Sequence, residues 1–326
     1  MASAFVTGGS GFIGGRLIER LRADGHQVRA LARSDDAAAR IRAHGGEPVA
    51  GELADAQAIE QGATDCEWAF HAAAALGDWG DRAEFERVNV GGTRTALEAC
   101  ARAGVKRFVH VGTEAALLAG QPLVEVDETA PLRPDSPVLY SSTKARAEQL
   151  VLDANREGFE TIVVRPRFVW GRGDTTLLPA MVEMVRSGRF AWIGGGRHRT
   201  SITHVENAVE GLVLAATRGT PGNAYFVTDG EPVVFREFVS ELLATQGVQE
   251  PTRSIPAPLA GALATGGEAA WRVLPLPGSP PVTRFAYWVS SQECTIKIDK
   301  ARAQLGYEPV KSRPEGLAEL RDGAAR

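Results

Sequence analysis

Residues 4–14 read Ala-Phe-Val-Thr-Gly-Gly-Ser-Gly-Phe-Ile-Gly, an apolar run that leads directly into a glycine-rich loop. The first four of these residues predict a short buried strand. Ile13, Leu17 and Leu21 then recur at helical spacing, which predicts a helix that ends near Gly25. A strand followed at once by a glycine-rich loop and a helix is the opening unit of a dinucleotide-binding fold. This junction guides the interpretation of the rest of the chain.

The glycines of the loop suit a pyrophosphate. Gly8, Gly11 and Gly14 permit a tight turn, close backbone approach to the phosphates and close packing of helix on strand. Phe12 and Ile13 stand at the start of the helix, where backbone N–H groups lack partners within the helix and can bind phosphate. A plain strand–helix turn is the alternative. The position of the loop at the first junction of an alternating pattern favours the dinucleotide site.

Strand-like and helix-like runs alternate through the first half of the chain, as in a parallel sheet covered by helices. The predicted strands are Val28–Ala32, Trp68–Ala73, Arg107–Val111 and Thr161–Val164, and the predicted helices are Phe85–Ala103 and about 140–156. The second half is less regular. It contains predicted helices at Leu177–Ser187, Val205–Thr217 and Phe235–Thr245, a strand at Ala224–Val227, and a loop or lid connector at 275–281.

These elements predict an α/β protein, with a Rossmann doubly wound parallel sheet and a smaller, discontinuous C-terminal substrate lobe. The expected dinucleotide-binding core is 1–170 and also receives about 200–230. The expected substrate-binding lobe is 171–199 and 231–326.

Composition narrows the class of protein. The formal net charge of −4 leaves no basic footprint for a nucleic acid. Cys66, Cys100 and Cys294 are widely spaced and fit reduced thiols better than a disulfide framework or a zinc site. The histidines have no metal-ligand spacing, so no metal is expected. The first strand begins too close to Met1 for a signal peptide, and we expect a cytoplasmic protein.

The most apolar late stretch is 255–276. It contains Glu268, Arg272 and several prolines, so no transmembrane segment is expected there. It remains able to lie against a membrane surface or an apolar ligand.

The end of the second strand should select the cofactor. An acidic residue there binds the adenosine ribose and favours NAD, whereas an arginine can accept the 2′-phosphate of NADP. The strand ends Ala32-Arg33-Ser34, and the first carboxylate is Asp35. Arg33 and Ser34 therefore favour NADP over NAD. A solvated surface arginine is the alternative, and Asp35 and Asp36 would repel a phosphate.

Tyr140 and Lys144 lie four residues apart and share one face of a predicted helix. Ketone reduction requires a hydride donor and a proton donor for the developing alkoxide. A tyrosine with a pKa of about 10 exchanges its proton at neutral pH only if a cation stabilises the phenolate. Lys144 and an oxidised nicotinamide can supply that charge. The pattern alone is more often a solvated helix face, and its combination with the glycine loop favours catalysis.

Thr113 follows the strand 107–111 at the carboxyl edge of the predicted sheet, where open α/β sheets bind ligands. Its hydroxyl can donate to a carbonyl or an alkoxide. A threonine that caps the following helical turn is the alternative.

Further motifs complete a pattern that covers essentially the whole chain. They are Thr7–Gly14, Gly51-Glu52-Leu53, His71-Ala72-Ala73, Asn89-Val90-Gly91-Gly92-Thr93, Thr113, Tyr140–Lys144, Arg165-Pro166, His204-Val205-Glu206-Asn207, Ile298–Ala301 and Leu305–Pro309. With these motifs the chain resembles the extended short-chain dehydrogenase/reductases, the NAD-dependent epimerase/dehydratase superfamily.

The resemblance implies that Thr113, Tyr140 and Lys144 are the catalytic triad and that Leu53 lies near the adenine. Glu52 stands where the family commonly has Asp, and Asn89 is expected to make a helix-packing hydrogen bond rather than to act in catalysis. The expected cofactor contacts, from the loop, the strand end and the resemblance together, are Gly8, Gly11, Phe12, Ile13, Gly14, Arg33, Ser34, Glu52, Leu53, Ala72, Ala73, Ala74, Tyr140, Lys144 and Pro166.

Epimerases and dehydratases of nucleotide sugars are the main rival group. They need cations around a diphosphate, often an arginine shortly before the His-Val motif. Thr200 stands in that place, with Arg197 and Arg199 nearby. Dehydratases also use an Asp-Glu pair after the catalytic threonine, and here Glu114 and Ala115 form an incomplete set.

The segments Thr203–Asn207, 255–271 and 280–285 are instead similar to 3β-hydroxysteroid dehydrogenases, the last two to bacterial members. An apolar, aromatic pocket suits a sterol or another bulky alicyclic ketone better than a charged sugar nucleotide. The core of the small lobe is the alternative role of these aromatic residues. They are Trp271, Phe285, Tyr287 and Trp288.

We therefore expect an NAD(P)-dependent oxidoreductase that interconverts a secondary alcohol and a ketone on a bulky apolar substrate. The leading substrate class is 3β-hydroxysteroids and 3-oxosteroids. Tyr140 would be the acid/base, Lys144 would lower its pKa and Thr113 would orient the oxygen. A nucleotide-sugar epimerase or dehydratase with the same triad is the alternative, and a non-catalytic dinucleotide-binding redox sensor is less favoured. The resemblance also implies a homodimer through the helices around 89–103 and 140–156.

Overall fold

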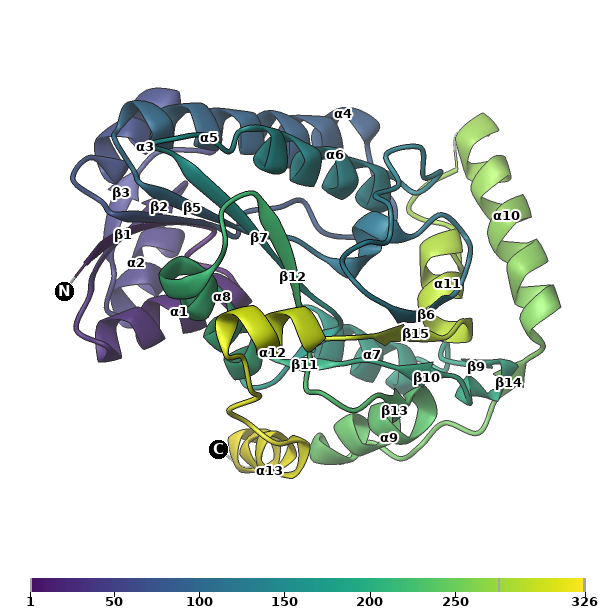
Figure 1. Ribbon diagram of the computed structural model, residues 1–326. Helices are drawn as coiled ribbons and strands as arrows, with labels where there is room; N and C mark the ends of the chain where they lie inside the picture. Colours follow the sequence, from purple (N-terminus) through teal and green to yellow (C-terminus); the bar gives the residue numbers. More distant parts are fainter. Residues whose placement is uncertain (1, 275, 325–326) are drawn as a thin grey trace.

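A seven-stranded parallel sheet forms the centre of the protein, with the order β12-β7-β5-β4-β1-β2-β3 (Figure 1). The computed structural model describes residues 2–274 and 276–324. The order reverses between β1 and β4, which is where open α/β sheets bind ligands. The predicted doubly wound Rossmann sheet is confirmed. Its strands are β1 (Ser3–Thr7), β2 (Gln27–Ala32), β3 (Glu47–Ala50), β4 (Trp68–His71), β5 (Arg107–Val111), β7 (Glu160–Pro166) and β12 (Asn223–Val227).

Helices cover both faces of this sheet (Figure 1). One layer contains α1 (Phe12–Ala23), α2 (Asp35–Ala43) and α8 (Val205–Arg218), and the other contains α3 (Ala56–Ala63), α5 (Gly92–Arg102) and α6 (Leu139–Asp153). Strand side chains alternate between the two layers. In β1, Ala4 and Val6 belong to the first core, whereas Phe5 belongs to the second. A strand buried on both faces explains why its sequence is continuously apolar.

The helix predicted at Phe85–Ala103 is wrong in one respect, because it is not continuous. A short α4 (Arg82–Phe85) is followed by a π-helical turn, η1 (Glu86–Gly91), before α5 begins. A π-helical turn holds one extra residue and changes the direction of the side chains that follow. Here it lets Asn89 reach across to two other segments. Two other predictions are too long, since β4 ends at His71 and α6 ends at Asp153.

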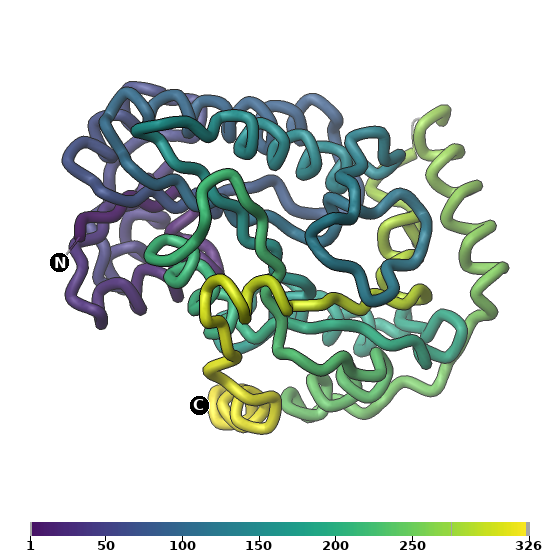
Figure 2. Tube along the Cα trace, in the orientation of Figure 1, coloured from purple at the N-terminus to yellow at the C-terminus, as the bar shows by residue number. Residues whose placement is uncertain are grey.

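Short strands and helices form a second region beside the carboxyl edge of the large sheet (Figures 1 and 2). Trp170, Trp192 and Phe238 lie in its core. Its four-stranded sheet has the order β13-β10-β15-β6, so β6, from within 1–170, pairs with β15 from near the C-terminus. The remaining elements are β6 (Leu123–Val126), β8 (Val169–Trp170), β9 (Trp192–Ile193), β10 (Arg199–Thr200), β11 (Thr203–His204), β13 (Val233–Val234), β14 (Ser254–Ile255), β15 (Cys294–Ile296), η2 (Glu114–Leu117), η3 (Gly194–Gly196), α7 (Leu177–Arg186), α9 (Phe235–Thr245), α12 (Asp299–Leu305) and α13 (Arg313–Ala324).

Helix α10 (Ala257–Val273) stands at the outer edge of this second region and packs against α11 (Arg284–Ser291) (Figure 1). No helix is predicted there from the sequence, because glycines and prolines weaken the helical pattern. The proline falls in the first turn, where its missing N–H costs nothing. Of the predicted connector 275–281, Pro275 lies outside the described residues, and 276–281 form neither helix nor strand. No helix in the described chain is long and apolar enough to cross a membrane.

Candidate active site

The glycine-rich loop joins β1 to α1 at the point where the strand order reverses. A Cβ atom at Gly14 would lie 2.2 Å from the carbonyl oxygen of Gly8, and a Cβ atom at Gly8 would lie 2.6 Å from the backbone nitrogen of Ala73. Gly8 also has φ +74, a conformation that glycine adopts without strain. Side chains at these positions would fill the space through which the backbone approaches a ligand.

The first turn of α1 is open to an anion. Gly11 is its N-cap residue, and within the described chain no side chain caps this helix. The N-termini of α2 and α3, by contrast, are capped by Ser34 and Asp55. The uncapped N–H groups and the positive end of the helix dipole suit a phosphate. The loop therefore fits the pyrophosphate of a dinucleotide.

The other residues predicted to contact the cofactor follow the carboxyl ends of neighbouring strands, so they share one edge of the sheet. Arg33 and Ser34 follow β2, Glu52 and Leu53 follow β3, and Ala72 to Ala74 follow β4. Pro166 ends β7, farther along the same edge. The sheet thus brings these predicted positions, distant in sequence, to one side of the molecule.

The residues that follow β2 and β3 differ in whether their side chains already contact other parts of the protein. Arg33 and Glu52 are exposed. The hydroxyl of Ser34 accepts a hydrogen bond from the backbone nitrogen of Ala37 at 3.2 Å. Leu53 packs so closely on α5 that a Cβ atom at Gly92 would lie 2.2 Å from its side chain. Ser34 is therefore already used as a helix cap, while Arg33 is accessible to a ligand.

Tyr140 and Lys144 lie in the first turns of α6, as the sequence predicts. Burial and the charge of Glu114 raise the pKa of Tyr140, and a hydrogen bond with Thr113 opposes that rise. Burial lowers the pKa of Lys144 to about 8, although the Glu148 carboxylate acts in the opposite direction. The phenol is therefore protonated at neutral pH, and the lysine is largely charged below pH 8.

Lys144 is held from the sheet side by two acceptors. Its ammonium donates to the carbonyl oxygen of Val111 at 2.8 Å and contacts Nε2 of His110 at 3.3 Å. Burial, followed by the charge of Lys144, lowers the pKa of His110 well below its usual value, so the imidazole is neutral and can accept. The ring of His71 stacks on that of His110. These contacts hold the lysine on the side of α6 that faces the end of β5. The sequence pattern includes His71 in the motif His71-Ala72-Ala73, but it indicates no role for His71 or His110.

Thr113 caps the following helical turn, as the alternative interpretation expects. Its oxygen accepts from the backbone nitrogen of Ala115 at 3.2 Å and so caps η2. Its hydroxyl donates to Oε2 of Glu114 at 2.9 Å. The hydroxyl proton is directed at Glu114 in this geometry, and the hydrogen bond that lowers the pKa of Tyr140 requires the Thr113 hydroxyl to rotate and donate to the phenolate.

Glu114 is the centre of a buried polar cluster that the sequence did not reveal. The guanidinium of Arg167 forms an ion pair with Glu114 Oε1, and both side chains are buried. Arg167 also donates to the hydroxyl of Thr200, at 3.1 Å from Nε and 2.9 Å from Nη2. The cluster ties the end of β5 to β10 of the second region. A similar buried pair, Arg165 with Glu148, lies on β7 and α6 behind Lys144.

Asn89 makes the packing contacts that the sequence analysis expects. Its side-chain oxygen accepts from the backbone nitrogen of Ala75 at 2.7 Å, and its amide donates to the hydroxyl of Thr143 at 3.0 Å. Asn89 therefore connects the segment after β4 to α6, one residue before Lys144. Its position follows from the π-helical turn, which is why a continuous helix would have misplaced it.

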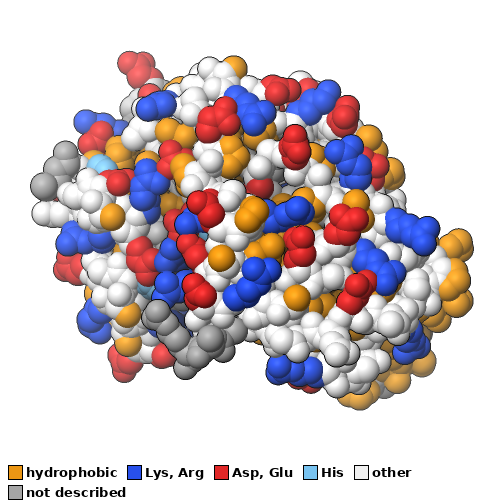
Figure 3. Space-filling model, turned by 90° about the horizontal axis from the view of Figure 1, so that it is seen from below, with side chains coloured by type: hydrophobic (Ala, Val, Ile, Leu, Met, Phe, Trp, Pro, Cys, Tyr) orange, Lys and Arg blue, Asp and Glu red, His pale blue; other side chains and the backbone are white. Residues whose placement is uncertain are grey.

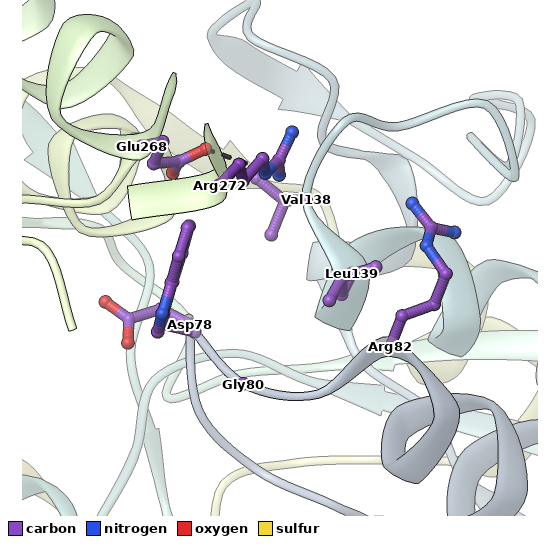
Figure 4. A pocket seen from close by; sticks show the side chains of 8 residues that line it. Asp78, Gly80, Arg82, Val138, Leu139, Glu268 and Arg272 are labelled. Atoms are coloured by element: carbon purple, nitrogen blue, oxygen red, sulfur yellow. Dashed lines mark ion pairs between the residues drawn. The ribbon is translucent and has the colours of Figure 1, made fainter. Parts of the chain in front are cut away.

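A cavity of about 280 Å³ opens beside the start of α6 (Figure 4). Val138 and Leu139 line one side, and Glu268 and Arg272 of α10 line the other. The segment 78–82 closes a third side, where the ring of Trp79 lies 5.8 Å from the guanidinium carbon of Arg272. Apolar and charged groups alternate around this cavity. It is therefore less uniformly apolar than the aromatic pocket expected from the sequence.

The four aromatic residues proposed as a pocket lining occupy different places. Phe285 packs edge-on against Tyr140, with ring centroids 5.7 Å apart. Trp288 is buried in the core, as the alternative interpretation expects. Tyr287 packs close to Gly261 of α10, and Trp271 donates to the carbonyl oxygen of Pro277 at 3.3 Å. Of the four, Phe285 is the one placed against the predicted catalytic tyrosine.

The positions weighed for a sugar-nucleotide enzyme differ in their exposure to solvent. Arg197 and Arg199 are exposed, and Thr200 is buried and engaged by Arg167.

Cys66, Cys100 and Cys294 are buried free thiols. Among the described residues, no group of three or more potential ligands could hold a metal ion.

Comparisons with known proteins identify relatives over most of the chain. Residues 5–257 match the 3-beta hydroxysteroid dehydrogenase/isomerase family. The chain is 47% identical over 318 residues to a 4-hydroxy-2-methyl-3-oxo-4-farnesyl-3,4-dihydroquinoline-1-oxide ketoreductase of Stigmatella aurantiaca, covering 97% of this chain and 95% of the relative. It is 33% identical over 340 residues to a 3 beta-hydroxysteroid dehydrogenase/Delta 5-->4-isomerase of Mycobacterium tuberculosis, covering 98% and 89%.

Two solved structures are similar over 99% of both chains. The crystal structure of gox2253 has a TM-score of 0.80 at 28% identity. MoeE5 in complex with UDP-glucose and NAD has a TM-score of 0.76 at 24% identity, which shows a shared fold.

Proposed function

The chain belongs to the 3-beta hydroxysteroid dehydrogenase/isomerase family, and we propose that it interconverts a ketone and a secondary alcohol on a bulky, largely apolar substrate with a nicotinamide dinucleotide. The proposal is supported by the hydrogen bond of Thr113 with Tyr140 and by Lys144, one turn along α6, whose ammonium donates to Val111 at the end of β5. The relatives named as ketoreductase and 3 beta-hydroxysteroid dehydrogenase support this reaction class. Sterol-like ketones and prenylated ring ketones are the leading substrates.

Tyr140 is the proton donor for reduction. Its raised pKa keeps the phenol protonated at neutral pH, and its hydroxyl delivers the proton to the substrate oxygen. The hydride for the carbonyl carbon would come from a reduced nicotinamide held at the glycine-rich loop. The charge left on the phenolate oxygen is stabilised by the ammonium of Lys144 one turn along α6. In the reverse direction Tyr140 acts as a phenolate and accepts the proton of the alcohol.

Thr113 orients the reacting groups through its oxygen. Its hydroxyl donates to the Tyr140 oxygen, which lowers the pKa of that phenol, and its remaining lone pair accepts from the hydroxyl of the alcohol. Phe285 and Leu139 bound the side of the site near the cavity and exclude water from the proton transfer. We place the apolar part of the substrate in this cavity.

Gly8, Gly11 and Gly14, with the N–H groups of Phe12 and Ile13, hold the pyrophosphate in this proposal, and Ala72 to Ala74 and Pro166 border the nicotinamide half. Arg33 selects NADP over NAD, because its exposed guanidinium follows β2 where the adenosine ribose would lie. Ser34 adds a hydroxyl donor beside it, and Leu53 and Glu52 border the adenine. Asp36 pairs with Arg40 at 3.0 Å, which reduces its repulsion of a 2′-phosphate.

The same proposal extends to the organisation of the chain. We assign 1–170 with about 200–230 to the dinucleotide-binding core, and 171–199 with 231–326 to the substrate lobe. The pairing of β6 with β15 adds residues 123–126 to that lobe. We also propose a cytoplasmic homodimer that associates through α5 and α6, which pack side by side on one face of the sheet.

The experiment follows nicotinamide absorbance with the purified protein, offering NADPH and NADH in parallel with 3-oxosteroids, prenylated quinoline ketones and simple cyclic ketones. Stoichiometric loss of reduced cofactor with formation of the alcohol supports the proposal. Interconversion of a uridine diphosphate sugar without net cofactor change would replace it with an epimerase.

A further inference from the structure

Helix α10 has an apolar outer face without a partner in the described chain. Its inner face is buried through Ala260 and Ala264. On the outer side Leu259, Leu263 and Val273 are 52%, 53% and 82% exposed. Leucines that follow the helix continue this surface, which we call the α10 ridge and define as Leu259, Leu263, Val273, Leu274 and Leu276.

The ridge concentrates the exposed apolar surface of the protein. Nine large hydrophobic side chains are exposed in the described chain, and five of them belong to the ridge. The other four, Leu76, Val124, Met184 and Val310, are far apart in the sequence. Single exposed apolar residues are ordinary on soluble proteins, whereas a contiguous group marks a surface that binds something. In Figure 3, hydrophobic side chains gather along the edge of the molecule that α10 forms, with Lys and Arg side chains beside them.

The exposed charges within the α10 segment itself have one sign. Between Arg253 and Gln292 the charged residues are Arg253, Glu268, Arg272 and Arg284. Glu268 is buried and shared by two guanidiniums, Arg284 at 2.7 Å and Arg272 at 3.6 Å. The carboxylate is thus neutralised inside the protein, and the exposed charges of the segment, Arg253 and Arg272, are both positive.

We propose that the α10 ridge docks the protein on an anionic lipid surface. A helix that shows an apolar face to the outside, with cations at its flanks, lies in the plane of a lipid interface. Anionic headgroups attract the arginines, and the leucine and valine side chains enter the apolar layer. A second copy is a poorer occupant, because a two-fold contact would bring the same arginines of both copies together.

The ridge and the site share a helix. Glu268 and Arg272, on the flank of α10, line the cavity that begins at Leu139, the residue before Tyr140. Docking would therefore place the mouth of this cavity at the lipid boundary, where an apolar ketone is concentrated. This last step rests on the proposed function, whereas the docking surface itself does not.

Sedimentation with vesicles tests the proposal. The full-length protein is mixed with vesicles of phosphatidylcholine alone or of equal parts phosphatidylcholine and phosphatidylserine, at low and high salt. We expect binding to the anionic vesicles that weakens with salt. The variant Leu259→Ser/Leu263→Ser/Val273→Ser should need at least about tenfold more lipid for half-maximal binding, because three apolar side chains no longer enter the bilayer. Arg253→Gln should weaken binding to the anionic vesicles by about fivefold.

The matched control is Val124→Ser/Met184→Ser/Val310→Ser, which changes three exposed apolar residues outside the ridge. It should bind vesicles as the unaltered protein does. Absence of binding at low salt, or equal losses in the two triple variants, would overturn the proposal. So would a fall in molar mass by light scattering without lipid in the ridge variant, since a second copy would then cover the ridge.

Measurement of turnover distinguishes failure of the docking proposal from failure of the proposed enzymatic function. With a water-soluble cyclic ketone and no vesicles, the ridge variant should turn over as fast as the unaltered protein, because none of its three residues borders the site. Vesicle binding without turnover of any ketone would reject the proposed function and leave the docking surface standing.

Discussion

The nucleotide side and the substrate side of the site are built in different ways. Around β1 and β4 the surface offered to a cofactor is backbone with small side chains: Gly8, Gly11, Gly14 and Ala72 to Ala74. Around the start of α6 the walls are large or charged side chains from distant segments, held by pairs such as Thr283 with Asp78 and Trp79 with Arg272. A site that binds its ligand through backbone groups needs only a short local motif. A site that binds through side chains needs several distant segments placed correctly relative to one another. This difference explains why the reaction class is readable from the sequence and the substrate is not.

The largest effect should come from the residue where the two sides meet. Tyr140→Phe removes the proton donor and keeps the ring that packs on Phe285. We expect ketone reduction to fall by at least about 10³-fold, at the upper range for loss of a general acid. Cofactor affinity, measured by quenching of protein fluorescence, should remain within about twofold, because the phenol adds little to binding a whole dinucleotide. A variant that kept a tenth of its activity would remove Tyr140 from the mechanism.

Cofactor affinity can be lowered without changing the substrate side of the site. In Gly14→Ala the new Cβ atom would lie 2.2 Å from the Gly8 carbonyl oxygen, so the loop must move. The displacement should weaken cofactor binding by about tenfold to a hundredfold, the range for overpacking a tight contact. Gly266→Ala is the matched control, since Gly266 lies in α10 and a Cβ atom there would meet no neighbouring atom within 4 Å. Equal cofactor affinity in the two variants, measured by titration, would show that the loop does not approach a ligand.

The nucleotide side and the substrate side also differ in how much of their structure could be predicted from the sequence. Most strands and helices around the sheet followed from period and turn residues, with bounds close to the predicted ones, as for α9 at Phe235–Thr245. The elements α2, β3 and α3, between β2 and β4, were not predicted. The π-helical turn at Glu86–Gly91 was missed, because its residues have ordinary helical patterning and its reason is the distant contact of Asn89 with Thr143. Helix α10 was missed because its glycines are tolerated only once Ala260 and Ala264 are buried.

Charged residues on the substrate side were the hardest to foresee. Arg167 and Glu114 stand 53 positions apart, and each by itself reads as a surface residue. Folding brings β5 and the end of β7 together, and the pair becomes buried. Long-range pairs of this kind leave no periodic signal in one sequence. The roles assigned to the site residues remain predictions that activity measurements test.

The substrate side should depend on this pair for stability. Glu114→Gln leaves the guanidinium of Arg167 buried without a carboxylate, and we expect a loss of about 3 kcal/mol in the free energy of unfolding. Glu114→Gln/Arg167→Met should recover most of that loss, because the uncompensated charge is gone. Denaturant unfolding of both variants measures the difference. A double variant that is less stable than the single one would mean that Arg167 stabilises the lobe through Thr200 instead.

Activity should also depend on pH through Lys144. Its pKa is lowered to about 8 by burial, so the ammonium is present below that pH and is lost as the pH rises through it. Phenolate stabilisation is lost with the charge, and kcat/KM for ketone reduction should fall by about tenfold for each pH unit above this value. Glu148→Gln removes the carboxylate that raises the pKa of Lys144, so the alkaline limb should move to lower pH. A limb that does not move would assign it to another group.

The smallest expected effect concerns the choice between NADPH and NADH, because this choice depends on a side chain rather than on the backbone of the glycine-rich loop. Arg33→Ala removes the exposed guanidinium after β2 and leaves the Ser34 cap of α2 intact. We expect the KM for NADPH to rise by about fivefold to tenfold, as for loss of one charge-assisted contact, with little change for NADH. Arg29→Ala, in β2 itself, is the control, since its guanidinium contacts the sulfur of Cys66. A rise that is equal for both cofactors would show that Arg33 does not recognise the 2′-phosphate. If Arg33 selects the cofactor, one side chain contributes to a nucleotide site that otherwise consists of backbone and small residues. A single residue at the end of a strand could then set cofactor preference without altering the fold.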